Sequence, residues 1–452
     1  MIRTKKRVKD LAEVFTNERE VNAMLDLVDD SDKGITNKID TKFIEPSCGN
    51  GNFLIEIFKR KLINCKTDDD ILTAVGSIYG VDISDINVIE ARERLQAMTD
   101  IDISDILKDN IILDNFLEPK TDRLKEILET EFDVIIGNPP YQKLDGGGAE
   151  HTASAVPLYH LFIQNSIKLN PSYLTMIVPS RWFATGRGLD KFRNFMLNSR
   201  ELKIIVDFQN SQECFPNVKI GGGVNYFLWE KCYKGDCLFK SSYQNAFKEH
   251  LVDLRENNIL IRDIVGLKIL KKIREKESKY LIDSVSKSRP FGLRTNFKDF
   301  KKEKTNNEYL KIYGNKFIGY IDDKIEIKNK NWINKWKTLS PKTGMGIEDK
   351  PLKIMHPPKI SEPGSLCTET YIVTGVFDTQ KEAENFLSFY KSKFFRFLVS
   401  LSKTGQDTAS KVYRFVPDLP MDKEWTDEIL YKKYNLTQEE IDYIEENIKE
   451  MD

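Results

Sequence analysis

Short apolar segments recur along the first half of the chain, and segments of helical character separate most of them. Their apolar residues follow one another without alternation, which is typical of strands buried on both faces of a sheet. Strands that alternate with helices build a doubly wound parallel sheet, so we expect an α/β fold with a Rossmann-like plan. Seven strands are predicted, at 43–44, 77–81, 111–113, 132–136, 173–178, 204–206 and 224–229.

The hydrophobic pattern changes after the last of these strands. Shorter apolar segments, turn signals and helical stretches follow, which predicts a mixed α+β domain. The predicted domains are an α/β unit over 1–240, the mixed domain over 241–425 and a helical tail over 426–452. Within the mixed domain, 381–400 has helical spacing with a stripe of aromatic residues, which predicts core packing. Thr437 is expected to open the last helix of the tail.

Composition narrows the class of protein. The 452 residues carry a formal net charge of -1, so a nucleic-acid surface would have to come from uneven charge distribution. Six cysteines without a CxxC pair and four histidines argue against a structural zinc site or a disulfide framework. Reduced cysteines fit a cytoplasmic protein. Neither a signal peptide nor a membrane-spanning stretch is predicted.

Polar side chains and glycines follow the first two predicted strands, where a doubly wound sheet binds its ligands. Glu45 leads into a turn with Gly49 and Gly51, whose backbone N–H groups can surround a ligand. A tight strand–helix turn explains the same glycines equally well. Asp82 can accept hydrogen bonds from both hydroxyls of a ribose, and capping of the next helix is the alternative.

Two aromatic positions are more ambiguous. Asn115 and Phe116 follow the third strand and could hold and cover a planar ring, although taken alone a loop with one buried phenylalanine is simpler. Phe215 follows the sixth strand and could pack on a planar ligand. A place in the hydrophobic core is an equally good interpretation of Phe215.

Asn138, Pro139, Pro140 and Tyr141 follow the fourth strand and form the most specific motif of the chain. Two consecutive prolines fix the backbone and remove two N–H donors. The Asn138 side-chain oxygen and the Pro139 carbonyl can then act as two acceptors, which suit an exocyclic amine with two hydrogens. Tyr141 can stack on a planar base. A chance turn is a much weaker explanation.

In their order along the chain, these motifs resemble those of the gamma class of DNA adenine-N6 methyltransferases. Further on, 221–229 and 403–407 look like stretches of Eco57I-type modification methylases of restriction–modification systems. In this resemblance Asn17 stands where Pro is common and Asn115 where Asp is common, the latter exchange keeping an acceptor oxygen. The residues that the resemblance assigns to S-adenosylmethionine are Phe15, Thr16, Glu45, Cys48, Gly49, Gly51, Asp82, Asn115, Phe116 and Asn138.

The resemblance implies methyl transfer from S-adenosylmethionine to N6 of an adenine in double-stranded DNA. The adenine would be flipped out of the duplex and stacked between Tyr141 and Phe215. Asn138 and Pro139 would hold its amine while the methyl group passes directly, with no covalent enzyme intermediate. No metal is expected. The chain has no Pro-Cys dipeptide, so the covalent cytosine-C5 route lacks its nucleophile.

A basic region in the second half supplies the predicted DNA surface. Lysines outnumber acidic residues between 288 and 359. Lysine binds phosphate and asparagine can contact adenine edges, although a solvated lysine-rich surface has the same composition. The candidate DNA contacts are Arg289, Arg294 and Lys335 in this region and Arg181 after the fifth strand.

Three alternatives stay open. A fused restriction–modification enzyme would cut as well as methylate, although nuclease domains of such proteins usually precede the methyltransferase. A methyltransferase acting on RNA or on protein glutamine could use the same Asn-Pro-Pro-Tyr motif. A DNA-specificity subunit could carry the fold without catalysis. A partner endonuclease is a further expectation from the resemblance, whereas neither recognition sequence nor oligomeric state is predicted.

Overall fold

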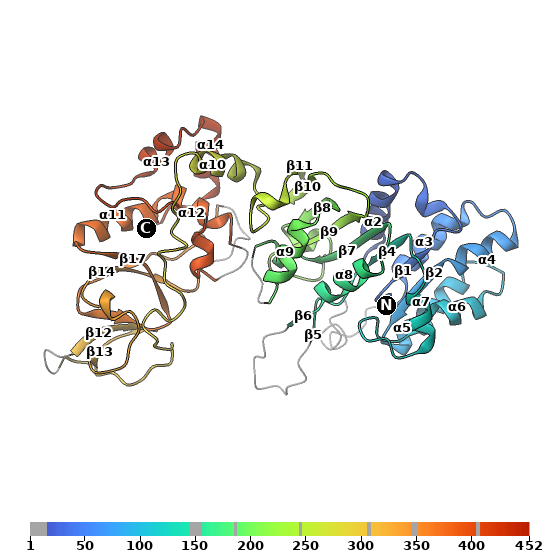
Figure 1. Ribbon diagram of the computed structural model, residues 1–452, viewed down its shortest axis with the longest axis horizontal. Helices are drawn as coiled ribbons and strands as arrows, with labels where there is room; N and C mark the ends of the chain where they lie inside the picture. The colour runs from blue at the N-terminus through green and yellow to red at the C-terminus, as the bar shows by residue number, and fades with distance from the viewer. Residues whose placement is uncertain are drawn as a thin grey trace. The chain divides into compact units, whose positions relative to one another are not determined.

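The computed structural model describes residues 16–143, 156–184, 188–243, 246–304, 309–344, 351–403 and 407–451. The chain forms two compact units, Met1–Leu260 and Ile261–Asp452 (Figure 1). The sheet of the first unit continues past residue 240, the end of the predicted α/β domain. Over the described ranges, no helix combines the length and the apolar character needed to cross a membrane.

A nine-stranded sheet forms the centre of the first unit, in the order β11-β10-β8-β9-β7-β4-β1-β2-β3. All seven predicted strands are present. They are β1 (Phe43–Glu45), β2 (Ile78–Asp82), β3 (Ile111–Leu113), β4 (Val134–Gly137), β7 (Tyr173–Pro179), β8 (Leu202–Phe208) and β9 (Val224–Glu230). Two more strands, β10 (Cys237–Tyr243) and β11 (Ala246–Val252), extend one edge. A separate short ladder pairs β5 (Gln142–Lys143) with β6 (Val156–Pro157).

The sheet is mixed, which corrects the expectation of parallel strands throughout. β1, β2, β3, β4 and β7 pair in parallel, whereas β9 runs antiparallel to both β7 and β8. A parallel return requires a crossover, usually through an α-helix. The connection from β8 to β9 contains only the short η3 helix (Ser211–Glu213), so the chain turns back beside β8.

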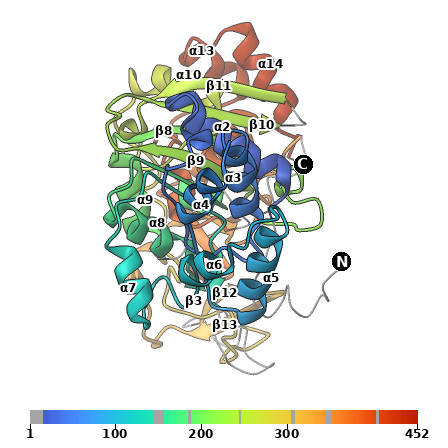
Figure 2. The ribbon, with the colours of Figure 1, turned by 90° about the vertical axis from the view of Figure 1, so that its right-hand side faces the viewer.

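Helices cover both faces of this sheet. Neighbouring residues of a strand point to opposite faces, so Phe43 joins one hydrophobic core and Ile44 the other. The first core contains residues of α2 (Glu18–Ser31), α3 (Asn52–Leu62), α4 (Asp68–Gly76), α5 (Asp85–Gln96) and α6 (Ser104–Asn110), the helices nearest the viewer in Figure 2. The second contains residues of α7 (Asp122–Leu128), α8 (Tyr159–Lys168) and α9 (Asp190–Asn198). Burial on both faces explains why the strands lack alternation.

The second unit contains two three-stranded sheets. One has the order β13-β12-β16 and the other β15-β14-β17. Their bounds are β12 (Tyr309–Gly314), β13 (Phe317–Asp322), β14 (Trp336–Pro341), β15 (Lys359–Ser361), β16 (Ser365–Cys367) and β17 (Tyr371–Phe377). The helices of this unit are α10 (Ile264–Arg274), α11 (Gln380–Lys391), α12 (Lys393–Ser400), α13 (Asp427–Lys433) and α14 (Gln438–Asn447).

The helical predictions for the second unit are confirmed with one refinement. Residues 381–400 form two helices instead of one, because Ser392 ends α11 and its side chain accepts from Phe395 N–H to cap α12. The predicted aromatic stripe is buried, as its core role requires: Phe386, Phe389, Tyr390, Phe394, Phe395 and Phe397. Thr437 caps α14 in a reciprocal capping box with Glu440.

Candidate active site

The carboxyl ends of β1, β2, β3 and β4 border one cavity of about 750 Å³ in the first unit. β1 pairs with β2 on one side and β4 on the other, so the chain crosses from one half of the sheet to the other here. Such a switch point is where doubly wound sheets bind ligands. The predicted residues that line the cavity are Thr16, Glu45, Gly49, Asp82, Asn115, Phe116, Asn138, Pro139, Pro140 and Tyr141.

The turn between β1 and α3 depends on two glycines. Gly49 and Gly51 have φ of +52° and +84°, in the left-handed region that glycine adopts at low cost. A Cβ on Gly51 would lie 3.1 Å from Ala91 Cβ on α5, so this position also requires close approach. The Gly49 N–H donates to Asp82 Oδ2 at 2.9 Å and joins the turn to the end of β2.

Asp82 has a carboxylate that several donors hold in place at the cavity wall. Its Oδ1 accepts from Ser84 N–H at 2.9 Å and from Asn87 Nδ2 at 3.2 Å. The N-cap of α5 is Ser84, whose side chain accepts from Asn87 N–H. The cap of α5 is therefore Ser84 and not Asp82, which was the alternative interpretation of Asp82. The hydrogen bonds from Ser84 and Asn87 fix the direction in which the Asp82 carboxylate faces.

Glu45 is the most buried acid of the cavity. It is 3% exposed, and among the described residues its Oε2 has no hydrogen-bond partner. Burial, and to a smaller extent the charge of Asp82, raises the pKa of Glu45 well above its ordinary value of 4.5. A Cβ on Gly137 would lie 3.2 Å from Glu45 Cγ, so the glycine leaves room for this side chain. A buried acceptor of this kind suits a cationic ligand.

The loop after β3 is organised by its own acids and amides. The Asp114 carboxylate accepts from the N–H groups of Asn115, Lys120 and Thr121 at 2.7, 3.0 and 2.8 Å. Asn115 Oδ1 accepts from Leu117 N–H at 3.0 Å. The ring of Phe116 stacks on that of Phe162 from α8, with centroids 5.8 Å apart and planes 12° apart. Asn115 and Phe116 thus reach the cavity on a rigid loop.

The Asn138–Tyr141 motif meets the other loops directly. The Asn138 carbonyl accepts from Ser47 Oγ at 3.2 Å, and Asn138 Nδ2 donates to Thr16 Oγ1 at 3.1 Å. The Tyr141 carbonyl accepts from Leu158 N–H at 3.1 Å, which ties the motif to the start of α8. Burial raises the pKa of the Tyr141 phenol well above its ordinary value, so this side chain is a neutral ring at the cavity.

Three predicted residues do not line the cavity. Cys48 and Phe215 are each 3% exposed and belong to a hydrophobic core. Burial raises the pKa of the Cys48 thiol well above its ordinary value, which disfavours a thiolate nucleophile. Gly51 lies against Ala91. Phe15 is outside the described residues, and the ligand-binding roles of these residues stay predictions.

The predicted DNA contacts occupy different surroundings. Arg181 is exposed and its Nε donates to the Gly221 carbonyl at 3.3 Å. In the second unit Arg289 pairs with Glu369 at 2.9 Å, and Lys335 pairs with Asp378. Arg294 is exposed and makes no ion pair with another described residue. Their roles in DNA binding also stay predictions.

Other cavity residues carried no clear sequence signal. Ser47 and Asn52 border the turn after β1, and a strand–turn–helix pattern could have suggested them. His160, Phe162 and Asn165 reach the cavity from α8. The sequence of α8 has the pattern of an ordinary amphipathic helix, so only the fold shows that one face of α8 borders the site.

The α/β sheet with its cavity at the carboxyl ends of β1 to β4 is a Rossmann-like methyltransferase fold, which solved restriction–modification enzymes share. The type IIL restriction–modification enzyme MmeI, solved in complex with DNA, shares this fold with a TM-score of 0.52 at 12% identity, covering 91% of this chain and 68% of that chain. The DrdV–DNA complex matches with a TM-score of 0.50 at 11% identity, covering 91% of this chain and 56% of that chain.

Residues 76–215 match the family model of the Eco57I restriction-modification methylase. An uncharacterized adenine-specific methylase of Mycoplasma pneumoniae is 31% identical over 153 residues, covering 32% of this chain and 36% of the relative. The type II restriction enzyme and methyltransferase RM.Eco57I of Escherichia coli is 26% identical over 245 residues, covering 40% of this chain and 24% of the relative. The chain thus spans about a third of the first relative's length and about a quarter of the second's.

Proposed function

We propose that this protein transfers a methyl group from S-adenosylmethionine to N6 of an adenine in DNA. The observation that carries the proposal is the meeting of Asn138 with Glu45 and Asp82 in one cavity. An amide acceptor for an exocyclic amine and two acids for a cationic nucleoside cofactor lie together there. The two relatives described above are named as an adenine-specific methylase and a restriction–modification methyltransferase, so RNA or protein-glutamine methylation is not favoured.

The cavity residues fit the cofactor by their chemistry. The cofactor carries an ammonium group, a ribose with two hydroxyls and a flat adenine. The unpartnered oxygen of Glu45 offers an acceptor for the ammonium group, and the fixed carboxylate of Asp82 faces the same cavity as an acceptor for the ribose. Asn115 and Phe116 offer a polar edge and a ring face for adenine. When bound, the cofactor supplies an electrophilic methyl group on a sulfonium.

The residues after β4 position the target base. The Asn138 side-chain oxygen and the Pro139 carbonyl accept the two N6 hydrogens, which draws the nitrogen toward tetrahedral geometry and turns its lone pair to the electrophile. Tyr141 stacks on the ring. Stacking of this kind is worth about 1–3 kcal/mol per base, enough to offset part of the few kcal/mol needed to flip the adenine out.

The second unit is proposed to recognise the DNA target. Between residues 288 and 344 there are fourteen lysines and arginines against six acidic residues. Such an excess favours contact with phosphates. Arg294 is the strongest single candidate there because no described acid neutralises it. We also propose a cognate endonuclease as partner and a cytoplasmic location, because the matching family model is that of a restriction–modification methylase.

Expression in a methylation-free host tests the proposal. Sequencing the host DNA with detection of modified bases is expected to find N6-methyladenine within one recognition sequence. The Asn138→Ala variant removes one of the two acceptors and is expected to leave the DNA unmodified while it still binds S-adenosylmethionine in calorimetry. Unmodified DNA from the wild-type protein, or full modification by the variant, would contradict the proposal.

A further inference from the structure

We propose that Thr16 is a positioning residue that holds the Asn138 carboxamide in place, so that its oxygen can accept from the target amine. The inference deepens the function proposed above and rests on it. Its basis is the contact in which Asn138 Nδ2 donates to Thr16 Oγ1 at 3.1 Å. The two residues are 122 positions apart in the sequence, and the fold brings them together.

The contact matters because a carboxamide has two chemically opposite ends. Its oxygen accepts hydrogen bonds, and its nitrogen carries two hydrogens that can only donate. An exocyclic amine held through its own N–H groups needs the oxygen. With Nδ2 directed to the Thr16 hydroxyl, Oδ1 is the end that can face the base. A half-turn about the side chain would place donor against donor at the reacting nitrogen.

Thr16 itself is fixed by a chain of hydrogen bonds. It is 4% exposed, and its carbonyl accepts from Asn52 Nδ2 at 3.0 Å. The Asn52 Oδ1 in turn accepts from Arg94 Nη1 at 2.9 Å, and the same nitrogen donates to the Asn50 carbonyl at 2.6 Å. The next residue, Asn17, donates from Nδ2 to the Cys214 carbonyl at 3.0 Å. The backbone around Thr16 is therefore tied to α3 and to the loop after β8.

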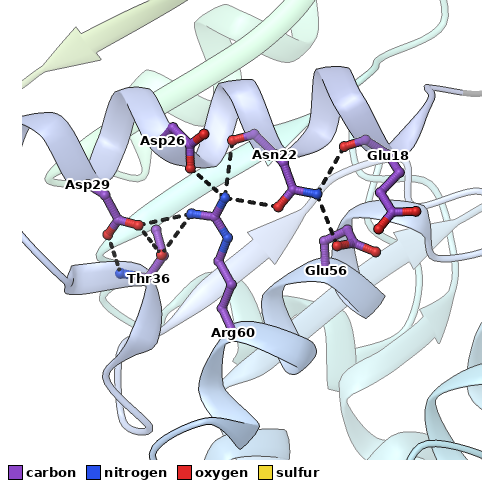
Figure 3. A network of polar contacts seen from close by, with 7 residues as sticks. All are labelled: Glu18, Asn22, Asp26, Asp29, Thr36, Glu56 and Arg60. Atoms are coloured by element: carbon purple, nitrogen blue, oxygen red, sulfur yellow. Dashed lines mark hydrogen bonds and ion pairs between the residues drawn. The ribbon is translucent and has the colours of Figure 1, made fainter.

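The helix that follows Thr16 is held in place as well. Figure 3 shows Arg60 of α3 reaching across to α2, where its two Nη atoms bond Asn22, Asp26 and Asp29. Arg60 also donates to Thr36 Oγ1 at 3.2 Å, which joins α3 to the segment before β1. Arg60 thus holds α2, the helix that follows Thr16, against α3.

The experiment compares single-turnover methylation rates on DNA from a methylation-free host, with S-adenosylmethionine in excess. Thr16→Val keeps the shape and removes the hydroxyl, so the rate is expected to fall about three- to tenfold, the value of one neutral hydrogen bond. Thr16→Ser retains a hydroxyl and is expected to restore most of the rate. The matched control is Thr41→Val, since Thr41 is also buried and donates to the Ile35 carbonyl at 2.9 Å, away from the cavity. It is expected to keep the wild-type rate.

Cofactor affinity is measured separately by calorimetry, because the resemblance also assigns Thr16 to S-adenosylmethionine. With the cofactor in excess, the single-turnover rate reports on the placement of the Asn138 carboxamide and not on a weaker affinity.

Two results would overturn the inference. These are a wild-type methylation rate in Thr16→Val and a loss confined to cofactor affinity. Wild-type protein that methylates no DNA would overturn the proposed function itself, and this inference with it.

Discussion

Glu45 gives the sharpest physical prediction, because it is a single buried titratable group at the proposed cofactor site. Its carboxyl is 3% exposed, and burial followed by the charge of Asp82 raises its pKa well above 4.5. In the free protein Glu45 therefore holds its proton to a higher pH than in the unfolded chain. A bound ammonium group favours the carboxylate instead. Binding below the raised pKa must then release up to one proton.

The magnitude follows from that stoichiometry. With one linked proton, cofactor affinity is expected to rise up to about tenfold per pH unit and to level off above the raised pKa. Glu45→Gln keeps the shape and removes the charge, so it is expected to bind about 10- to 150-fold more weakly, the value of a charge-assisted hydrogen bond of about 1.5–3 kcal/mol. Its affinity is expected to be independent of pH over the same window.

Calorimetry measures the proton directly. Titration with S-adenosylhomocysteine, which keeps the ammonium group, in two buffers of different ionisation enthalpy gives the number of protons released. Glu56→Gln is the matched control, since Glu56 is 7% exposed but already bound to Asn22 and Lys59. It is expected to leave the proton release unchanged. No proton release from the wild type, or wild-type affinity in Glu45→Gln, would refute the reasoning.

Glu45 also affects the stability of the free protein. Its effect on the free energy of unfolding changes with pH in the opposite direction to that of a salt-bridged acid. Because the folded pKa of Glu45 lies above the unfolded value, its contribution to the free energy of unfolding is complete below pH 4.5. That contribution declines as pH rises through the folded pKa, by at most about 1.4 kcal/mol per pH unit. Glu45→Gln is expected to flatten this part of the denaturation profile.

Two further predictions concern stability, each with a matched control in denaturant unfolding. Gly51→Ala is expected to lower the free energy of unfolding by about 1–3 kcal/mol, because φ is +84° and the new Cβ would meet Ala91 at 3.1 Å. Gly34→Ala, with φ of +76° and open space around the new Cβ, should lower it less. An equal loss in both variants would show that the contact with Ala91 is irrelevant. Arg60→Met is expected to cost about 1–3 kcal/mol because Arg60, 15% exposed, joins α2 to α3. Arg123→Met removes an exposed pair with Glu126 and an exposed hydrogen bond to the Asp109 carbonyl, so it should change little. Similar values for the two arginines would contradict a bracing role for Arg60.

The fold was predictable where one physical cause dominates. Burial on both faces gives unalternated apolar strands, and all seven strands predicted on that basis exist. β10 and β11 escape the pattern because they lie at the edge of the sheet, where Lys240, Lys248 and Glu249 interrupt the apolar residues. The direction of β9 was not predictable, since it depends on the missing crossover helix and not on the composition of the strand.

Asn115 shows where residue-by-residue reasoning about the site reaches its limit. The sequence indicates that asparagine keeps an acceptor oxygen where an acid is common in the resembling family. In the structure that oxygen already accepts from Leu117 N–H at 3.0 Å, while the neighbouring Asp114 is occupied by the N–H groups of Lys120 and Thr121. The loop itself uses one of the two lone pairs of this oxygen, which no single-sequence pattern could reveal.

The same distinction applies to the catalytic motif. A local sequence can specify that an amide and two rigid prolines follow the end of β4, because prolines and strand burial act over a few residues. It cannot specify which residue holds the Asn138 amide, since the side chain that bonds it is Thr16, which is 122 residues away. Thr16 is in turn placed by Asn52 and by the bracing of α2. The motif therefore supplies the chemical groups, and the packing of α2 on α3 places the residue that holds Asn138. Variants that loosen α2 should therefore impair catalysis although they leave the motif unchanged.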